Sequence, residues 1–138
     1  MAADVWGVLM RRDCPLAARE AVRPEDLWDL PLILSSQAME GRELSGWLGR
    51  EYEELNVAAT YTLLYNASLL VKEGVGCALC LDGILNTSGD SPFVFRPLAP
   101  RLEARLNVVR KKYQVLSKAA RTFWERLQDR LEARRAAP

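Results

Sequence analysis

The feature that most constrains the fold is a nearly continuous apolar run at residues 75–81, Val-Gly-Cys-Ala-Leu-Cys-Leu. Before it lies a segment whose apolar residues recur at helical spacing: Leu63, Ala67, Leu70 and Val71. Gly74 stands between the two, where a positive φ can end a helix. The pattern predicts helix, tight turn and buried strand. Because a strand that is apolar on both faces is typical of a sheet covered on both sides, we predict an α/β fold.

Length and charge limit the possible functions. The 138 residues suffice for one compact domain or for part of a larger, two-lobed one. Lys and Arg total 19 against 18 Asp and Glu, so the net charge of +1 creates no general attraction for nucleic acid or membranes. No apolar run approaches the roughly 20 residues that span a bilayer, and the first residues do not resemble a signal peptide. We therefore expect a cytoplasmic protein without a membrane partner.

Further elements follow from local patterns of apolar and turn-forming residues. Strands are predicted at residues 5–10, 32–34, 57–61, 93–98 and 104–110. An amphipathic helix is predicted at residues 41–55, and a last helix begins at about Ser117. A short helical turn is predicted at residues 24–30, with Pro24 and two acidic residues in its first positions.

Two motifs that suggest chemistry have structural interpretations. Gly74-Val75-Gly76 lies between a helix and a strand, whereas a dinucleotide site needs strand, glycines and helix in that order. We interpret Gly74 as a helix stop and Gly76 as a place where the strand packs close to its neighbour. Cys77 and Cys80 match C-x-x-C by letter, but residues three apart on a strand face opposite sides. We expect both to be buried thiols.

Catalytic and metal-binding residues are not evident in the sequence. Histidine, the commonest general base, is absent, and no carboxylate pair follows a predicted strand. Three cysteines make neither a disulfide framework nor a four-ligand zinc site. The basic run 110–112 is interpreted as a solvated surface because acidic residues interrupt the charge of the last helix. We expect no enzymatic activity, no metal and no cofactor.

Polar side chains follow two of the predicted strands and are the candidate ligand-binding residues. Ser35, Ser36 and Gln37 come after the strand at 32–34, and Thr60 and Thr62 close the strand that begins near Val57. In open α/β sheets, ligands bind beyond the carboxyl ends of the strands, where free backbone amides suit an anion. The alternative interpretation, that Ser36 and Thr62 cap the helices that follow, has equal weight.

Several motifs follow one another along the chain: an apolar strand at 5–10, a Pro-Leu-Ala turn at 15–17, a Leu-x-x-Leu-Pro-Leu-Ile element at 27–33 and a helix ending in Val-x-x-Gly-x-Gly at 71–76. They are followed by Arg96-Pro97-Leu98, 106–110 and 116–123. This order of motifs resembles the effector-binding domain of LysR-type transcriptional regulators. The resemblance covers nearly the whole chain. It departs at Cys14, where the family usually has His, and at Leu81 or Asp82, where the family usually has Pro.

The resemblance implies a periplasmic-binding-protein-like (type II) fold of two lobes. Residues 1–14 are expected to be the crossing strand of the first lobe, 15–90 the complete second lobe, and 91–138 the return to the first lobe with the C-terminal helix. The family's helix-turn-helix and the first part of its first lobe have no counterpart in this sequence. DNA is therefore expected as a partner only through an N-terminal domain that this chain lacks.

The function that the resemblance implies is the sensing of a small-molecule effector, with an anion favoured, by a self-associating bacterial regulator. Self-association is expected through strand pairing or exchange of the terminal helix, because apolar surfaces and strand edges would be exposed. The alternatives are a solute-binding protein of the same architecture and a stand-alone small-ligand-binding domain. An upstream helix-turn-helix would favour the regulator, and a secretory leader the solute-binding protein.

Overall fold

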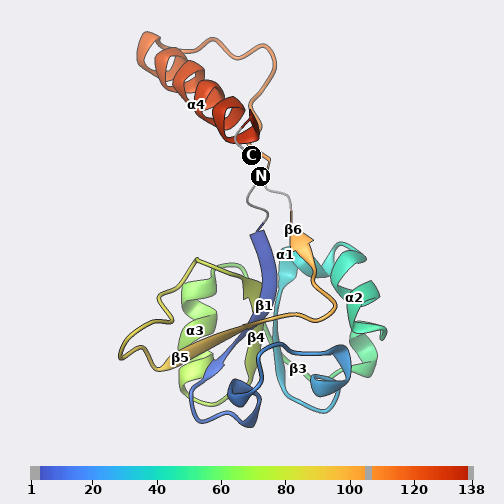
Figure 1. Cartoon of the computed structure of the whole chain (residues 1–138). Helices are drawn as coiled ribbons and strands as arrows, with labels where there is room; N and C mark the ends of the chain where they lie inside the picture. The colour runs from blue at the N-terminus through green and yellow to red at the C-terminus, as the bar shows by residue number, and fades with distance from the viewer. Residues whose placement is uncertain (1–3, 105–106, 137–138) are drawn as a thin grey trace. The chain divides into compact units, whose positions relative to one another are not determined.

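The computed structural model describes residues 4–104 and 107–136 (Figure 1). The described chain divides into a sheet unit, Asp4–Ala104, and a second unit that contains the last helix. The sheet unit alternates strands and helices, and the two elements flanking the apolar run, α3 (Leu64–Lys72) and β4 (Cys77–Leu81), form where they were predicted. Gly74 has φ +78° and ends α3, which confirms its predicted role.

The sheet contains the predicted strands in the order β3-β2-β4-β1-β5. Strand β2 (Leu32–Ser35) runs parallel to β3 (Val57–Tyr61) on one side and to β4 on the other. Strand β1 (Asp4–Arg11) is antiparallel to β4 and to β5 (Phe93–Pro97), and its first residues pair with the short β6 (Glu103–Ala104). The mixed sheet thus has a parallel half in which β2, β3 and β4 end at one edge.

Both faces of the sheet are covered, as the apolar run predicts. On one face α3 packs Leu64, Ala67 and Val71 into a cluster that includes Ala78 and Cys80 of β4. The other face is covered by α1 (Ser36–Met39), α2 (Glu43–Leu48) and the 3-10 turns η1 (Pro15–Ala18), η2 (Pro24–Asp26) and η3 (Tyr52–Glu54). The cluster on that face includes Cys77 and Leu79 of β4. Side chains on the two faces of β4 therefore pack against both helical layers.

Two predicted elements are wrong in extent. The helix expected at 41–55 is only α2, because Gly49 adopts φ +67° and stops it, and η3 replaces its second half. The strand expected at 104–110 is limited to β6 in the described residues. Residues 107–110 form no strand, and both valines among them are exposed to solvent. Residues 105–106 lie outside the described residues.

The last helix, α4 (Lys118–Ala136), begins where predicted. The hydroxyl of Ser117 accepts the Ala120 N–H at 3.2 Å and satisfies one of the free donors of the first turn. Trp124 and Leu127 are half-buried within this unit, and the Arg110 guanidinium lies 5.1 Å from the Trp124 ring centre. Among the described residues, no helix combines the length and apolar character that crossing a bilayer requires.

A glycine is required at position 76, directly before β4 begins. A Cβ at this position would lie 2.3 Å from the Pro31 carbonyl oxygen, which also accepts the Cys77 N–H at 2.9 Å. The two backbones can approach to this distance because residue 76 has no side chain. The predicted close packing at Gly76 is confirmed.

We expect Gly76→Ala to destabilise the protein by about 1–3 kcal/mol, the usual range for overpacking. The matched control is Gly46→Ala in α2, where an added Cβ meets nothing within 4 Å. It should be neutral or stabilise by up to about 1 kcal/mol, because alanine loses less backbone entropy in a helix. Urea unfolding followed by circular dichroism measures both. Equal stability of Gly76→Ala and wild type would contradict the steric role.

Candidate functional site

The candidate site lies where the carboxyl ends of the parallel strands β2, β3 and β4 meet, and we call this end of the sheet the edge. Ser35 and Tyr61 are the last residues of β2 and β3 and are paired in register, and β4 ends nearby at Leu81. Strand β1 is antiparallel and therefore starts at the same edge, with Trp6 opposite Leu81. The fold thus brings the two predicted groups of polar residues, after β2 and at the end of β3, to neighbouring positions.

The two serines after β2 have different partners. The Ser35 hydroxyl accepts the Ala38 N–H at 3.4 Å and caps α1, whereas the Ser36 hydroxyl donates to the Tyr61 carbonyl at 2.9 Å. The second hydrogen bond joins the end of β2 to the end of β3. Both side chains are half-buried. The edge is therefore held in one arrangement before any ligand arrives.

The capping alternative is wrong for the residues to which it was applied. Ser35, not Ser36, caps α1, because the helix already begins at Ser36 and the residue before it must be extended. The residue that precedes α3 is Leu63, and no side chain caps it, so Thr62 does not cap that helix. Thr60, Thr62 and Gln37 are exposed at the edge.

Tyr61 supports the site and was not singled out from the sequence. Its hydroxyl donates to the Leu79 carbonyl of β4 at 2.8 Å, across the intervening β2. Burial, with a smaller contribution from Cys80, raises the pKa of Tyr61 well above its usual range. Ala59 and Tyr61 pack against the cluster under α3 while Thr60 between them is exposed, so the apolar-polar-apolar order Ala-Thr-Tyr was the available signal that this side chain faces the core.

A turn after β4 adds an acidic group that sequence reasoning also missed. The Asp82 N–H donates to the Val5 carbonyl at 2.9 Å, and its carboxylate accepts the Gly83 N–H at 2.7 Å. Gly83 has φ +76°, so the turn needs a residue that tolerates the left-handed conformation. The Leu-Asp-Gly sequence directly after a buried strand was the signal for this turn.

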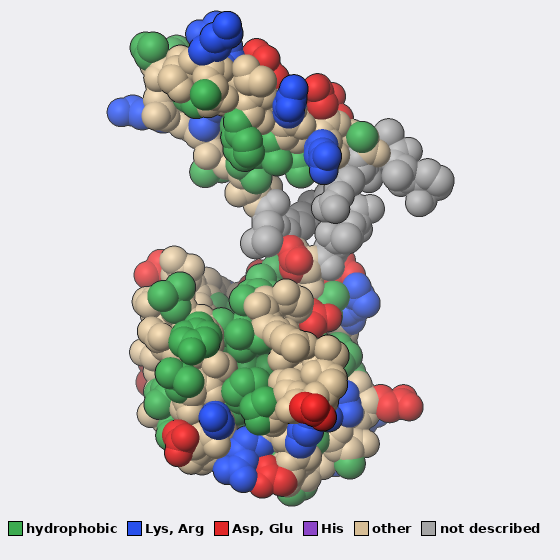
Figure 2. All heavy atoms as spheres, turned by 90° about the vertical axis from the view of Figure 1, so that its left-hand side faces the viewer, with side chains coloured by type: hydrophobic (Ala, Val, Ile, Leu, Met, Phe, Trp, Pro, Cys, Tyr) green, Lys and Arg blue, Asp and Glu red, His purple; other side chains and the backbone are tan. Residues whose placement is uncertain are grey.

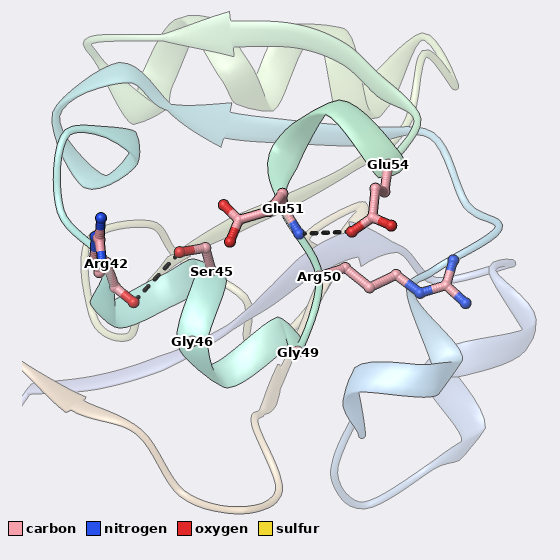
Figure 3. A pocket seen from close by; sticks show the side chains of 7 residues that line it. All are labelled: Arg42, Ser45, Gly46, Gly49, Arg50, Glu51 and Glu54. Atoms are coloured by element: carbon pink, nitrogen blue, oxygen red, sulfur yellow. Dashed lines mark hydrogen bonds between the residues drawn. The ribbon is translucent and has the colours of Figure 1, made fainter.

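Two surface hollows lie away from this edge. One, of about 420 Å³, lies between α2 and η3 (Figure 3) and is lined by Arg42, Ser45, Gly46, Gly49, Arg50, Glu51 and Glu54. Two of its charged groups have partners within the fold: the Glu54 carboxylate accepts the Glu51 N–H at 3.1 Å, and the Arg50 guanidinium lies 4.1 Å from the Trp28 ring centre. The other, of about 300 Å³, is lined by Arg11, Arg12, Asp13, Lys72 and Pro92. Neither contains a predicted ligand residue.

The C-x-x-C pair behaves as the strand alternation predicts. Cys77 belongs to the cluster under α2 and Cys80 to the cluster under α3, so they face opposite sides of β4. Burial raises the pKa of each thiol to about 12. The two sulfur atoms therefore cannot act together on one ligand.

Comparison with known proteins identifies the fold. The family model described as the LysR substrate binding domain matches residues 1–132. The HTH-type transcriptional regulator YfeR of Shigella flexneri is 28% identical over 128 residues, which are 92% of this chain and 42% of that protein. The structure of HinK, a LysR family regulator from Pseudomonas aeruginosa, superposes with a TM-score of 0.70 at 20% identity and covers 95% of this chain and 46% of HinK.

The solved structure of an isolated regulatory domain is also similar to this chain. The CcmR regulatory domain of Synechocystis PCC6803 matches 90% of this chain and 61% of its own length, with a TM-score of 0.61 at 19% identity. The chain belongs to the LysR substrate-binding domain family and has its periplasmic-binding-protein-like type II fold. It corresponds to the effector-binding portion of a LysR-type regulator. It spans a little under half the length of YfeR and HinK.

The pKa of Tyr61 predicts a specific pH dependence of stability. The folded-state pKa of Tyr61 lies above the unfolded value near 10. The neutral Tyr61 side chain therefore contributes fully to the free energy of unfolding below pH 10, and this contribution is lost as the pH rises above 10. Tyr61→Phe should cost about 0.5–1.5 kcal/mol at pH 7 through the lost hydrogen bond and should lose less stability than wild type between pH 10 and 11. Urea unfolding at both pH values measures this, and parallel losses would contradict it.

Proposed function

We propose that this domain binds a small effector at the edge formed by the ends of β2 and β3. The observation that carries the proposal is the hydrogen bond from Ser36 to the Tyr61 carbonyl, which fixes the two strand ends side by side. Ser35, Gln37, Thr60 and Thr62 stand around this bond and complete the proposed polar wall. Membership of the LysR substrate-binding domain family supports the binding of a small ligand by this domain.

Three residues at this edge have chemical roles that their environments permit. The Ser36 hydroxyl has used its proton on Tyr61, so it offers lone pairs to a ligand donor. Thr62 is exposed and does not cap α3, so its hydroxyl can donate to a ligand oxygen. The N–H groups at the start of α3 lie beside it and favour a carboxylate or a similar anion. Asp82 lies after β4 and suits a cationic or hydroxyl group at the other end of the ligand.

The rest of the binding cleft belongs to the proposed two-lobed arrangement. In this arrangement residues 15–90 form the second lobe, and residues 1–14 and 91–138 belong to the first. In this arrangement the two flanking segments are joined to the second lobe by hydrogen bonds, since β1 and β5 lie in one sheet with β4. One relative, the CcmR regulatory domain, is described in complex with 2-PG, which supports ligand binding by this fold. A regulator of bacterial genes would work in the cytoplasm.

Binding at the edge would regulate transcription by changing the populations of two arrangements of the protein. A ligand shifts such an equilibrium only by the difference between its affinities for the two states. Ser36 lies at a junction of two strands, so a ligand that contacts it is attached to the sheet as a whole and not to one movable side chain. The output would be a change in the geometry of a self-associated regulator bound to DNA through a separate domain.

We expect Ser36→Ala and Thr62→Ala to weaken effector binding in the full-length regulator by about ten- to a hundredfold each, the effect of losing one hydrogen bond to a buried ligand group. Isothermal titration calorimetry with the effector measures the affinity. The matched control is Ser88→Ala, whose loop contacts Arg12 just after the opposite end of β1. Unchanged affinity in both site variants with intact circular dichroism would overturn the assignment.

Self-association is the second part of the proposal, and the structure offers a surface for it. Figure 2 shows apolar side chains gathered on the face over α3. The exposed ones in and around α3 are Leu63, Tyr65, Leu69 and Val75, with exposed fractions of 64%, 66%, 48% and 38%. We place the contact between two copies on this α3 face because the sheet already fixes these residues in one rigid surface. Exposed apolar patches of this kind mark interaction sites.

We expect Leu69→Glu to abolish self-association or to weaken it at least tenfold, because it buries a charge in the contact. Light scattering after size exclusion over a range of concentrations measures the mass. Phe123→Glu is the matched variant on α4, where Phe123 is 68% exposed. Loss of association in Phe123→Glu but not in Leu69→Glu would show that the terminal helix makes the contact instead.

A further inference from the structure

Cys14 and Cys77 lie at the same end of the sheet unit. Strand β1 is antiparallel to β4 with Leu9 opposite Ala78, so the end of β1 runs beside the start of β4, where Cys77 stands. Beyond β1 the chain turns back at once, because the Cys14 N–H donates to the Arg11 carbonyl at 3.1 Å. A turn of this kind keeps the α-carbons of its first and last residues within about 7 Å of each other. The topology therefore brings two thiols together that are distant in sequence.

The environment of the two side chains supports this juxtaposition. Cys77 is 8% exposed and belongs to the core cluster under α2, and half-buried Cys14 packs against that same cluster. The pKa of Cys77 is raised to about 12, chiefly by burial and further by the charge of Cys14 and its hydrogen bond with that thiol. Cys80 faces the other cluster.

We propose that Cys14 and Cys77 are an oxidisable pair that hydrogen peroxide converts into an intramolecular disulfide. Neither the effector site nor the proposed function uses this pair. The disulfide would join the turn before η1 to the first residue of β4, at the opposite end of β4 from the candidate ligand edge. It would close a loop that contains β2, β3 and α3.

The chemistry assigns a different role to each cysteine. Cys14 is the more accessible, so its sulfur attacks peroxide first, forming an S–O bond, breaking the O–O bond and releasing water. The buried Cys77 sulfur then attacks the Cys14 sulfur, forming the S–S bond and breaking the S–O bond. The hydroxide that leaves takes the Cys77 proton as a second water. The two thiols lose two electrons, and one peroxide is reduced to two waters. The high pKa of Cys77 makes the second step slow.

Peroxide treatment of the full chain, followed by alkylation under denaturing conditions and mass spectrometry, tests the proposal. We expect a monomeric product with one alkylatable thiol in place of three, restored to three by dithiothreitol. Tryptic digestion should yield residues 13–19 linked to residues 73–101, because Pro97 blocks cleavage after Arg96. Because the second peptide contains both Cys77 and Cys80, the test is repeated in Cys80→Ala, in which the same link should form.

Two further variants test which two cysteines form the disulfide. In Cys14→Ser and in Cys77→Ala, no intramolecular link should form, while circular dichroism shows whether each variant remains folded. The proposal would be overturned by three free thiols after peroxide, by a link between two copies through Cys14, or by Cys14 oxidised to sulfinic acid while Cys77 stays free. A link that disappears in Cys80→Ala would assign the chemistry to Cys80 and would equally overturn it. Effector affinity is not a readout here, so failure of this pair leaves the proposed function untouched.

Discussion

The burial of β4 on both faces is the constraint on which the rest of the sheet unit depends. Cys77 and Leu79 hold the layer of α2 and the 3-10 turns, while Ala78 and Cys80 hold α3. The strand is also central, with the parallel strand β2 on one side and the antiparallel strand β1 on the other. Because every layer contacts this one strand, a polar residue placed in it would disturb both clusters at once. Its sequence has no polar residue between Cys77 and Leu81.

The sequence predicts this centre well because the signal is local. A helix, a glycine with positive φ and an apolar run are each readable within about ten residues, and α3, Gly74 and β4 form as expected. The extent of the helix after residue 41 was less predictable, since its apolar spacing continues past Gly49. The backbone conformation of that one glycine ends α2, and the remaining apolar side chains, Tyr52 in η3 and Leu55 directly after it, pack against the core from a 3-10 turn and its end instead. Periodicity reports which side chains are buried and does not specify the backbone that buries them.

The candidate site, too, was predictable from the sequence only in part. That polar residues follow β2 and β3 is evident from the sequence, and parallel pairing brings those strand ends together. Which serine caps α1 was not predictable, because Ser35 and Ser36 are chemically identical and the boundary of a four-residue helix decides between them. Tyr61 escaped notice because its hydroxyl bonds to Leu79, a residue two strands away in the sheet. Such a contact depends on strand order, which no local pattern encodes.

Hydrogen bonds connect the ligand edge to the centre of the sheet. Ser36 holds the backbone of Tyr61, the side chain of Tyr61 holds the backbone of Leu79, and Leu79 is paired with Val8 of β1. A displacement of the β2 end by a ligand is therefore opposed by β3, β4 and β1 together and not by a single side chain. Rigid connection of this kind favours a switch in which whole lobes move as bodies, because the edge cannot adjust without moving the strands. In the proposed two-lobed arrangement, the difference between the two states would then lie outside this hydrogen-bonded network, and the ligand edge itself would stay nearly unchanged.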